Sequence, residues 1–201
     1  MEKKIVEKKI KKETKKESLK IEVLDFVRMI LICFVFVFLC VKFIFRPVTV
    51  DGSSMYPTLI DKEFGFSNVF STFVSEPQRF EVVVTYYEPT DKLWVKRVIG
   101  LPGEKVEYKD NKLYINDEYI EETFFDEEYV KSVTNDGKSN FTADVEPYFL
   151  GEDEYFLMGD NRQVSKDSRV VGPFTRDDIV SKYVLVLYPF DKMGIISDDT
   201  K

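Results

Sequence analysis

Residues 80–99 read FEVVVTYYEPTDKLWVKRVI, and this stretch indicates the fold class. It contains two short runs, Phe80–Tyr87 and Lys92–Ile99, that are rich in β-branched and aromatic residues, and the residues between them are typical of a turn. Side chains of these kinds pack well on a pleated, half-buried surface. The stretch therefore predicts two β-strands.

The same pattern recurs further along the chain. Four more strands are predicted: Lys105–Lys109, Lys112–Ile115, Glu154–Met158 and Lys182–Leu187. The sequence KDNK at 109–112 is typical of a hairpin turn. A short helix is predicted at Thr175–Val180, because Thr175 is a suitable cap and two aspartates suit the first turn. Residues 121–150 are acidic and turn-rich, which favours a peripheral excursion. Taken together, the predicted strands indicate an all-β body with antiparallel sheets.

A different pattern precedes the body. Residues 24–45 read LDFVRMILICFVFVFLCVKFIF, and as a helix they would reach about 33 Å, enough for a hydrocarbon core of about 30 Å. Arg28 and Lys42 lie where their charged ends can reach the two interfaces. A buried core helix would not need the nine lysines of residues 1–20, and a cleaved signal peptide should end in a small-x-small site that is absent here. We expect one transmembrane helix.

The segment before this helix is basic. Its composition favours a solvated tail, disordered or helical. By the positive-inside rule, residues 1–23 are expected in the cytoplasm and the body outside. Residues 1–46 carry a net charge of +6 and residues 47–201 a net charge of −13. A body this acidic would be repelled by phosphate backbones, so no nucleic-acid partner is expected.

The residue types that are missing restrict the chemistry. The chain has 201 residues, enough for one principal domain, and contains no histidine. A Ser-His-Asp triad, a Cys-His pair and a His-containing metal site are thereby excluded. Both cysteines, Cys33 and Cys40, lie in the apolar segment, so the body has no disulfide, redox pair or catalytic thiol. A nucleophilic mechanism would need Ser, Thr or Lys, and neither a metal nor a cofactor is expected.

Two segments offer such groups. DGSSMYPTL at 51–59 directly follows the apolar segment, and its Gly and Pro bracket a tight turn that can direct backbone N–H groups at one point, as an oxyanion hole requires. In a strand, Trp94, Lys96 and Val98 share one face, so Lys96 would have apolar neighbours. Burial lowers the pKa of a lysine, and a neutral amine can accept a proton from a serine hydroxyl. A plain Ser-rich turn and a lysine solvated at a strand edge are the open alternatives.

A third segment, MGDNRQVSKDSR at 158–169, is a dense polar loop between two strand-like runs. Its groups are either tied into turn hydrogen bonds or functional. In the functional interpretation, Ser165 orients a lysine amine, and Asp167 with Arg169 braces the loop.

Taken together and in this order, the three segments resemble the type I signal peptidases, which are bacterial membrane-bound Ser/Lys endopeptidases. SMYPTL follows a membrane span, KRVIGLPGE comes about 40 residues later, and MGDNR with S-x-DSR comes about 60 residues after that. The resemblance covers the chain from the span to about Val180. It implies a membrane-anchored serine endopeptidase that removes signal peptides with small residues at −1 and −3 from exported preproteins.

The resemblance also assigns roles. Ser54 is the nucleophile, Lys96 the general base, and the Ser54 backbone N–H an oxyanion donor. Gly52 occupies a position where relatives have serine or glycine, so a side-chain donor is absent there. Ser165 matches the residue that orients the lysine. Supporting positions are matched by Asp160, Arg162, Asp167 and Arg169, with Arg97 as ion-pair partner of Asp160.

This chain departs from the usual family pattern at two places, and two apolar surfaces are expected, one for the substrate and one for lipid. Phe80-Glu81 stands where relatives often have Gly-Asp, and Gln163-Val164 where Asp-Asn is usual. Shallow pockets for small substrate side chains are expected to be lined by Val48, Val50, Met55, Leu59, Trp94 and Val95. An apolar surface for lipid headgroups, or alternatively part of the core, is expected from Phe64, Phe66, Phe70 and Phe73.

The sequence thus predicts an all-β ectodomain on one transmembrane helix in a bacterial cell membrane. The expected parts are a basic cytoplasmic tail (1–23), the transmembrane helix (24–45), a catalytic β domain (46–103 and 151–190), an inserted β subdomain (104–150) and a C-terminal tail (191–201). Two other functions remain open. A self-cleaving peptidase of the repressor type would need a DNA-binding segment where this chain has the span, and a non-catalytic assembly factor would have no need of Ser54, Lys96 and Ser165 together.

Overall fold

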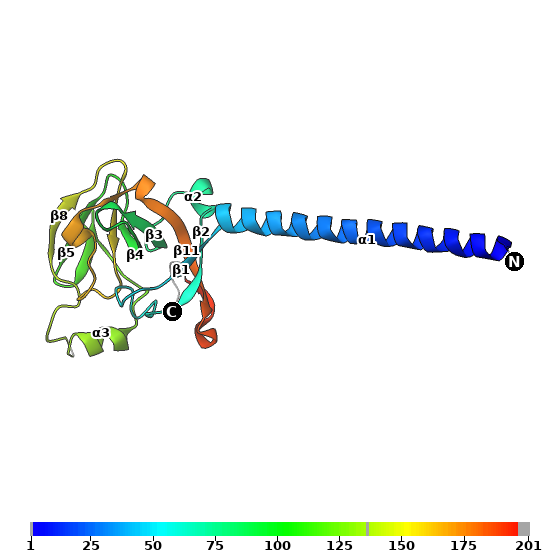
Figure 1. Cartoon of the computed structure of the whole chain (residues 1–201). Coiled ribbons are helices and arrows are strands. Elements are labelled where there is room, and N and C mark those ends of the chain that lie inside the picture. The colour runs from blue at the N-terminus through cyan, green and yellow to red at the C-terminus, as the bar shows by residue number, and fades with distance from the viewer. Residues whose placement is uncertain (1, 136, 197–201) are drawn as a thin grey trace. The chain divides into compact units, whose positions relative to one another are not determined.

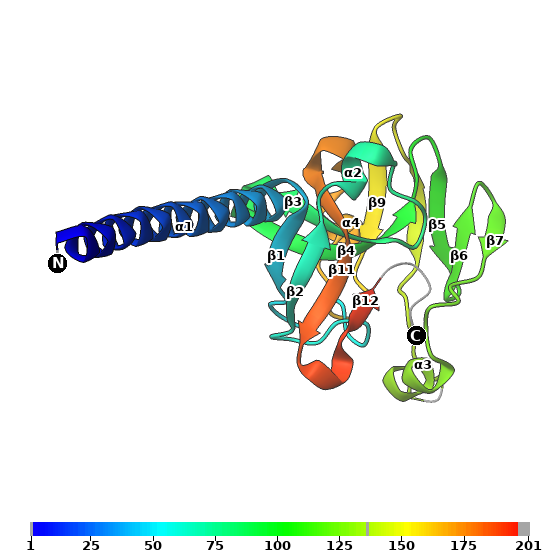
Figure 2. The ribbon, with the colours of Figure 1, turned by 90° about the vertical axis from the view of Figure 1, so that its right-hand side faces the viewer.

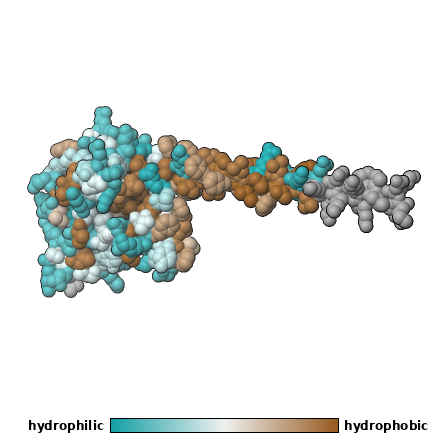
Figure 3. All heavy atoms as spheres, viewed as in Figure 1, coloured by the Kyte–Doolittle hydropathy of each residue, from teal (hydrophilic) through white to brown (hydrophobic). Residues whose placement is uncertain are grey.

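The computed structural model describes residues 2–135 and 137–196, in two units, 1–42 and 43–201. The first unit is formed by helix α1 (Glu2–Phe43). Its Glu17–Phe43 segment is long and apolar enough to cross a membrane: an 18-residue stretch within it has a mean hydropathy of 2.6, and none of that stretch is buried. Figure 3 shows the apolar side chains along this helix.

The helix differs from the prediction at both ends. It includes the basic tail from Glu2 onward, and it ends at Phe43, two residues before the predicted end. Strand β1 begins at Phe45, which the prediction had placed in the helix. Sheet pairing accounts for the early end, because Phe45 pairs with Asn68 of the neighbouring strand.

The second unit contains two antiparallel sheets, which confirms the all-β fold class (Figures 1 and 2). The larger sheet has the order β1-β2-β11-β3-β4-β9-β10, with β12 paired to β11. Its strands are β1 (Phe45–Thr49), β2 (Phe64–Asn68), β3 (Val82–Tyr87), β4 (Lys92–Gly100), β9 (Glu154–Met158), β10 (Phe174–Thr175), β11 (Ile179–Tyr188) and β12 (Gly194–Ile196). The smaller sheet has the order β7-β6-β5-β8, from β5 (Lys105–Lys109), β6 (Lys112–Ile115), β7 (Glu118–Ile120) and β8 (Val145–Phe149).

All six predicted strands are present, and so is the predicted hairpin turn. Lys109 pairs with Lys112 across β5 and β6, and the two residues between them have left-handed φ angles of 51° and 63°. Asp110 and Asn111 are residue types that tolerate this conformation, which hairpin turns of this length require.

The helices of the second unit are short. They are α2 (Ser71–Val74), α3 (Glu127–Val133) and α4 (Ser168–Val171), with 3₁₀ turns η1 (Glu88–Thr90), η2 (Arg176–Asp178) and η3 (Phe190–Lys192). The predicted helix at Thr175–Val180 is wrong beyond its first turn. Thr175 does cap a turn, but Ile179 is buried and begins β11, where it pairs with Thr85 of β3. Burial in the sheet outweighs the local helix signal.

One apolar cluster holds the serine-containing loop against the larger sheet. Met55 and Leu59 are 1% and 0% exposed, and they pack with Val82 and Val84 of β3 and with Val186 of β11. The loop at 51–59 is therefore anchored through two side chains inside the core, which fixes the residues between β1 and β2.

Candidate active site

The loop that carries Ser54 is closed by backbone hydrogen bonds at its base. The Val50 N–H donates to the Glu63 carbonyl at 2.8 Å, and the Lys62 N–H donates to the Val50 carbonyl at 2.8 Å. Gly52 has a left-handed φ of 95°, which suits glycine, and its N–H donates to the Asp61 carboxylate at 2.7 Å. Among the hydrogen bonds of the described residues, none uses the Ser54 N–H as donor, so that N–H remains available at the turn.

Lys96 lies on β4 and meets this loop. Its Nζ donates to the Ser54 Oγ at 2.9 Å, and the residue is 3% exposed. The same amine lies 5.5 Å from the centre of the Trp94 ring, the neighbour two residues earlier on the same strand face. The expected alternation along the strand thus places the amine against apolar groups and against the serine hydroxyl.

The surroundings of Lys96 change its acidity. Burial is the largest influence and lowers the pKa of the amine to about 8, although the charges of Asp167 and Asp160 act in the opposite direction. A lysine in water has a pKa of about 10.4. A substantial fraction of the Lys96 amine is therefore neutral at mildly alkaline pH and able to accept a proton.

The polar loop at 158–169 clamps the backbone around the serine. The Asn161 N–H donates to the Ser54 carbonyl at 3.0 Å, and its side-chain amide donates to the Ser53 carbonyl at 3.1 Å. Gly159 passes so close that a Cβ at this position would lie 2.4 Å from the Ser54 carbonyl oxygen and 2.2 Å from the Ser165 Oγ. Only a residue without a side chain fits there.

A buried ion pair connects this loop to β4. Arg97, on the strand face opposite Lys96, donates from Nε and Nη2 to both carboxylate oxygens of Asp160 at 2.9 and 2.7 Å, and both side chains are fully buried. The Thr58 hydroxyl donates to the same carboxylate at 2.5 Å. The pairing expected of Arg97 and Asp160 is present, and Thr58 extends it to the serine loop.

Ser165 lies beside these groups without a hydrogen bond. Its hydroxyl oxygen is buried and has no hydrogen-bond partner among the described residues, Lys96 included. It is held close to the serine loop by the backbone of Gly159. The hydroxyl is thus near the Ser54 backbone, but the contact with the Lys96 amine that the resemblance implies is not formed here.

Asp167 and Arg169 brace the loop. Burial raises the pKa of Asp167, but the hydrogen bond and charge of Arg169 and the Gly159 N–H outweigh it, so the net shift is downward. Arg169 donates from Nε and Nη2 to this carboxylate at 2.8 Å each, and from Nη1 to the Arg162 carbonyl at 2.7 Å. The expected brace is present as a charge-assisted network.

Arg162 points away from the serine. Its guanidinium donates to the Tyr108 and Thr142 hydroxyls at 3.0 Å each and forms an ion pair with Glu122. All three partners belong to residues 105–149, so Arg162 ties the loop to the smaller sheet and its connections.

Four of the six expected pocket residues line a cavity of about 290 Å³ that contains Ser54 and Lys96. They are Val50, Met55, Trp94 and Val95. Val48 and Leu59 do not line it; they belong to the core cluster beneath the loop, to which Val50 and Met55 also belong. Lys166 and Leu93 also line this cavity.

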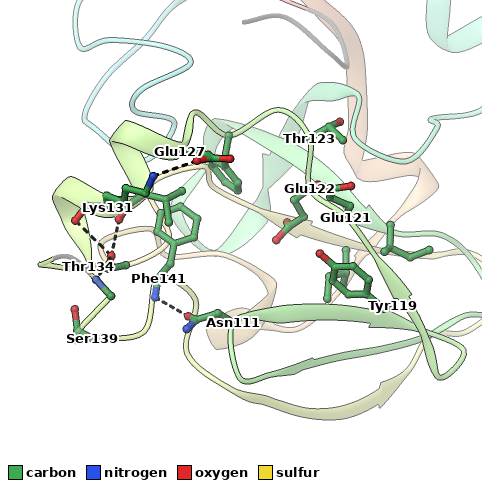
Figure 4. Close-up of a pocket in the computed structure, with 15 residues that line it drawn as sticks. Asn111, Tyr119, Glu121, Glu122, Thr123, Glu127, Lys131, Thr134, Ser139 and Phe141 are labelled. Atoms are coloured by element: carbon green, nitrogen blue, oxygen red, sulfur yellow. Dashed lines mark hydrogen bonds and ion pairs between the residues drawn. The ribbon is translucent and has the colours of Figure 1, made fainter.

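A second cavity, of about 650 Å³, lies between α3 and the smaller sheet (Figure 4). Glu121, Glu127, Lys131 and Phe141 are among its lining residues, and Lys131 forms an ion pair with Glu127. It includes neither Ser54 nor Lys96, so it is separate from the site. Among the described residues, no group of three potential ligands is placed to hold a metal ion.

Three contributors to the site were not assigned from the sequence: Thr58, Asp61 and Asn161. Thr58 and Asp61 lie in or next to the SMYPTL segment, and Asn161 lies within MGDNR. Their position inside these segments is a signal that sequence reasoning did not use, because the hydrogen bonds they form depend on how distant loops meet.

The chain is similar in sequence to known proteins. The model of the family described as signal peptidase, peptidase S26, matches residues 23–188. Signal peptidase I P of Bacillus subtilis subsp. natto is 39% identical over 90% of this chain and 96% of its own length, and signal peptidase I S of Bacillus subtilis (strain 168) is 40% identical over 88% and 95%. Signal peptidase IB of Staphylococcus aureus (strain COL) is 35% identical over 87% and 94%.

Among solved structures, a signal peptidase I from Enterococcus faecalis V583 is 32% identical, and the match covers 54% of this chain and 97% of that one with a TM-score of 0.46. The family match spans the apolar helix, the serine loop, β4 and the polar loop, and the relatives are similar over nearly their whole length. The chain therefore belongs to the signal peptidase family, peptidase S26.

Proposed function

We propose that this signal peptidase-type serine endopeptidase removes N-terminal signal peptides from exported preproteins with a Ser54–Lys96 dyad and an acyl-enzyme intermediate. The observation that carries the proposal is the 2.9 Å contact between the Lys96 Nζ and the Ser54 Oγ, with the amine buried and its pKa lowered to about 8. A nucleophile within hydrogen-bond distance of a group that is neutral near working pH meets the requirement for general-base activation.

In the proposed mechanism, the Ser54 Oγ attacks the substrate carbonyl carbon while its proton passes to the Lys96 Nζ. The Ser54 N–H stabilises the oxyanion; the Gly52 N–H is engaged by Asp61, so a second donor does not come from there. The Lys96 ammonium then gives its proton to the leaving amine, and Lys96 activates the water that hydrolyses the ester. The Ser165 hydroxyl, which has no partner in the resting site, holds the ammonium once it forms.

The proposed substrate segment lies in the cavity beside the dyad. Val50, Met55, Trp94 and Val95 form its apolar walls, and its volume is about 290 Å³. Two substrate side chains would share this volume, which supports small side chains at −1 and −3. Steric exclusion is the basis of this selectivity, because a large side chain would have to displace residues that are packed in the core.

We further propose that α1 anchors the protein in a bacterial cell membrane as a single pass, with the N-terminus in the cytoplasm and residues 46–190 outside. Exposed aromatic side chains on the second unit support contact with lipid. Phe64, Phe70 and Phe73 are 39%, 53% and 77% exposed. Tyr188 pairs with Phe64 in the sheet, and the exposed Phe190 ring lies 5.8 Å from the Tyr188 ring.

The domain division is part of the proposal. Residues 46–103 and 151–190 form the catalytic domain, and residues 104–150 form an inserted β subdomain. The smaller sheet consists of strands from this insertion, which supports the division.

The test is cleavage of a preprotein by the purified, detergent-solubilised chain, with the mature N-terminus identified by mass spectrometry. Ser54→Ala should reduce cleavage by at least about 10⁴-fold, because the nucleophile is lost, while circular dichroism stays unchanged. Ser53→Ala is the matched control, since it removes the adjacent hydroxyl and should retain activity. A Ser54→Ala enzyme with wild-type activity refutes the dyad, and a wild-type chain that cuts no preprotein favours the assembly factor. If the chain cleaves itself but no preprotein, the self-cleaving alternative is favoured.

A further inference from the structure

We infer that Lys166 determines a second element of specificity, by binding an acidic side chain of the substrate upstream of the bond that is cut. The inference rests on the proposed function, because it concerns the same cavity. It adds a charge preference to the size preference that the apolar walls impose.

Lys166 is held at the cavity by its neighbours. Ser165 is 9% exposed and Asp167 is fully buried, so the backbone on both sides is fixed, whereas the Lys166 side chain is exposed and lines the cavity with Ser54, Lys96 and Trp94. Its Nζ lies 5.8 Å from the centre of the Tyr87 ring. The ammonium is therefore confined to the rim of the cleft.

Lys166 is also the cation in this cavity that a ligand can reach without breaking an existing contact. The cavity has three charged or ionisable lining residues, Asp51, Lys96 and Lys166. The Asp51 carboxylate forms an ion pair with Lys62, and the Lys96 amine bonds to Ser54. Among the described residues, no carboxylate lies within ion-pair distance of the Lys166 ammonium.

A row of aromatic rings places Lys166 on the upstream side. The Lys96 Nζ lies 5.5 Å from the Trp94 ring, and the Trp94 ring lies 4.2 Å from the Tyr87 ring. The Lys166 ammonium lies 5.8 Å from the centre of that same Tyr87 ring. Trp94 lines the part of the cavity that the proposed function gives to the −1 and −3 side chains. Lys166 therefore lies next to the part of the cavity that would hold the residues upstream of the cut bond.

The geometry of an extended peptide then selects the positions. Alternate side chains point to opposite faces, with about 3.3 Å per residue. When the −1 and −3 side chains point into the apolar walls, those at −2 and −4 point to the open side, where Lys166 is exposed. A carboxylate at −2 or −4 can therefore reach the ammonium, and a cation there is repelled.

The test measures kcat/KM of the full-length, detergent-solubilised enzyme on peptides with Glu, Gln or Lys at −2, −4 or +2. Exposed ion pairs are weak, so we expect the wild type to prefer Glu over Lys at −2 or −4 by about three- to fivefold, less at high salt. Lys166→Glu should reverse this ratio, and Lys166→Gln should bring it close to one. Because the ratio compares peptides on one enzyme, a change in stability or in the Lys96 pKa cancels.

Lys112→Glu is the matched control. The Lys112 Nζ also lies 5.8 Å from a tyrosine ring, that of Tyr119, but in the smaller sheet and away from the cavity. This variant should keep both the activity and the wild-type ratio. A wild-type ratio of one at −2 and −4, a ratio unchanged in Lys166→Glu, or a charge preference only at +2 would overturn the inference. If the Gln peptide is itself not cut, the proposed function fails, and the inference fails with it.

Discussion

Lys96 is the residue on which the proposed chemistry depends. It combines a 2.9 Å contact to the Ser54 Oγ with burial that lowers its pKa to about 8. Neither property is sufficient alone. A charged amine cannot accept a proton, and a neutral amine that is out of reach cannot accept the proton of the Ser54 hydroxyl. Both properties follow from the position of Lys96 on β4 between Trp94 and the serine loop.

The pH dependence of cleavage follows from this pKa. The base is active when it is unprotonated, so the rate should increase with pH, about tenfold per unit below pH 8, and level off above it. A pH profile of kcat/KM between pH 6 and 10 on a neutral peptide measures this. A profile that is flat over this range, or whose midpoint lies near that of a free lysine, contradicts Lys96 as the base.

At the scale of elements, the site depends on the loop after β9 fitting against the serine loop. Gly159 is the closest point, where a Cβ would meet the Ser165 Oγ and the Ser54 carbonyl at 2.2 and 2.4 Å. Neither neighbour can move freely, because Ser165 is buried and the Ser54 carbonyl already accepts a hydrogen bond from Asn161.

We therefore expect Gly159→Ala to lower kcat by 10-fold or more, on the order of 1.4 kcal/mol in barrier, through displacement of the nucleophile. Gly151→Ala is the matched control, because Gly151 lies just before β9 and its added Cβ would be 3.4 Å from the nearest atoms, those of the Glu154 side chain. Steady-state kinetics together with thermal unfolding of both variants tests this. Equal activity of the two variants would show that the close approach is unimportant.

The insertion at 104–150 also contacts both catalytic loops. The Tyr129 hydroxyl of α3 donates to the Tyr56 carbonyl at 3.3 Å. The Gln163 side-chain amide donates to the Val133 and Asn140 carbonyls at 3.3 and 3.2 Å. Gln163 belongs to one of the two residue pairs that depart from the usual family pattern, and in this chain it joins the polar loop to the insertion.

At the scale of the whole molecule, the orientation in the membrane can be tested with cysteine labelling. The chain's two cysteines, Cys33 and Cys40, lie in α1 and can be replaced by serine. In that background, Lys109→Cys on the exposed end of β5 should react with a membrane-impermeant maleimide in intact cells. Glu17→Cys, the control on the basic side, should react only after permeabilisation. The reverse pattern would contradict the proposed orientation.

Sequence determined the features that depend on local composition. Alternating β-branched runs, the Asp-Asn hairpin turn and the long apolar segment each carry their own signal, so six of the strands, the turn and one membrane-length helix were predictable, whereas β1, β2, β7, β8, β10 and β12 were not predicted. The alternation around Lys96 also placed its amine on an apolar face before any contact was known. The helix end at Phe43 and the loss of the predicted helix at 175–180 were not predictable, because neighbouring strands competed for those residues.

Tertiary structure alone decided which groups meet. Ser54 and Lys96 are 42 residues apart, and Thr58 and Asp160 are 102 apart, so their contacts arise only when β3, β4 and the two loops pack together. The same packing buries Val48 and Leu59 in the core and leaves Val50 and Trp94 on the cavity wall. Residue types specify which chemistry is available, whereas burial and distance, which set the pKa of the amine and its reach, are properties of the folded chain.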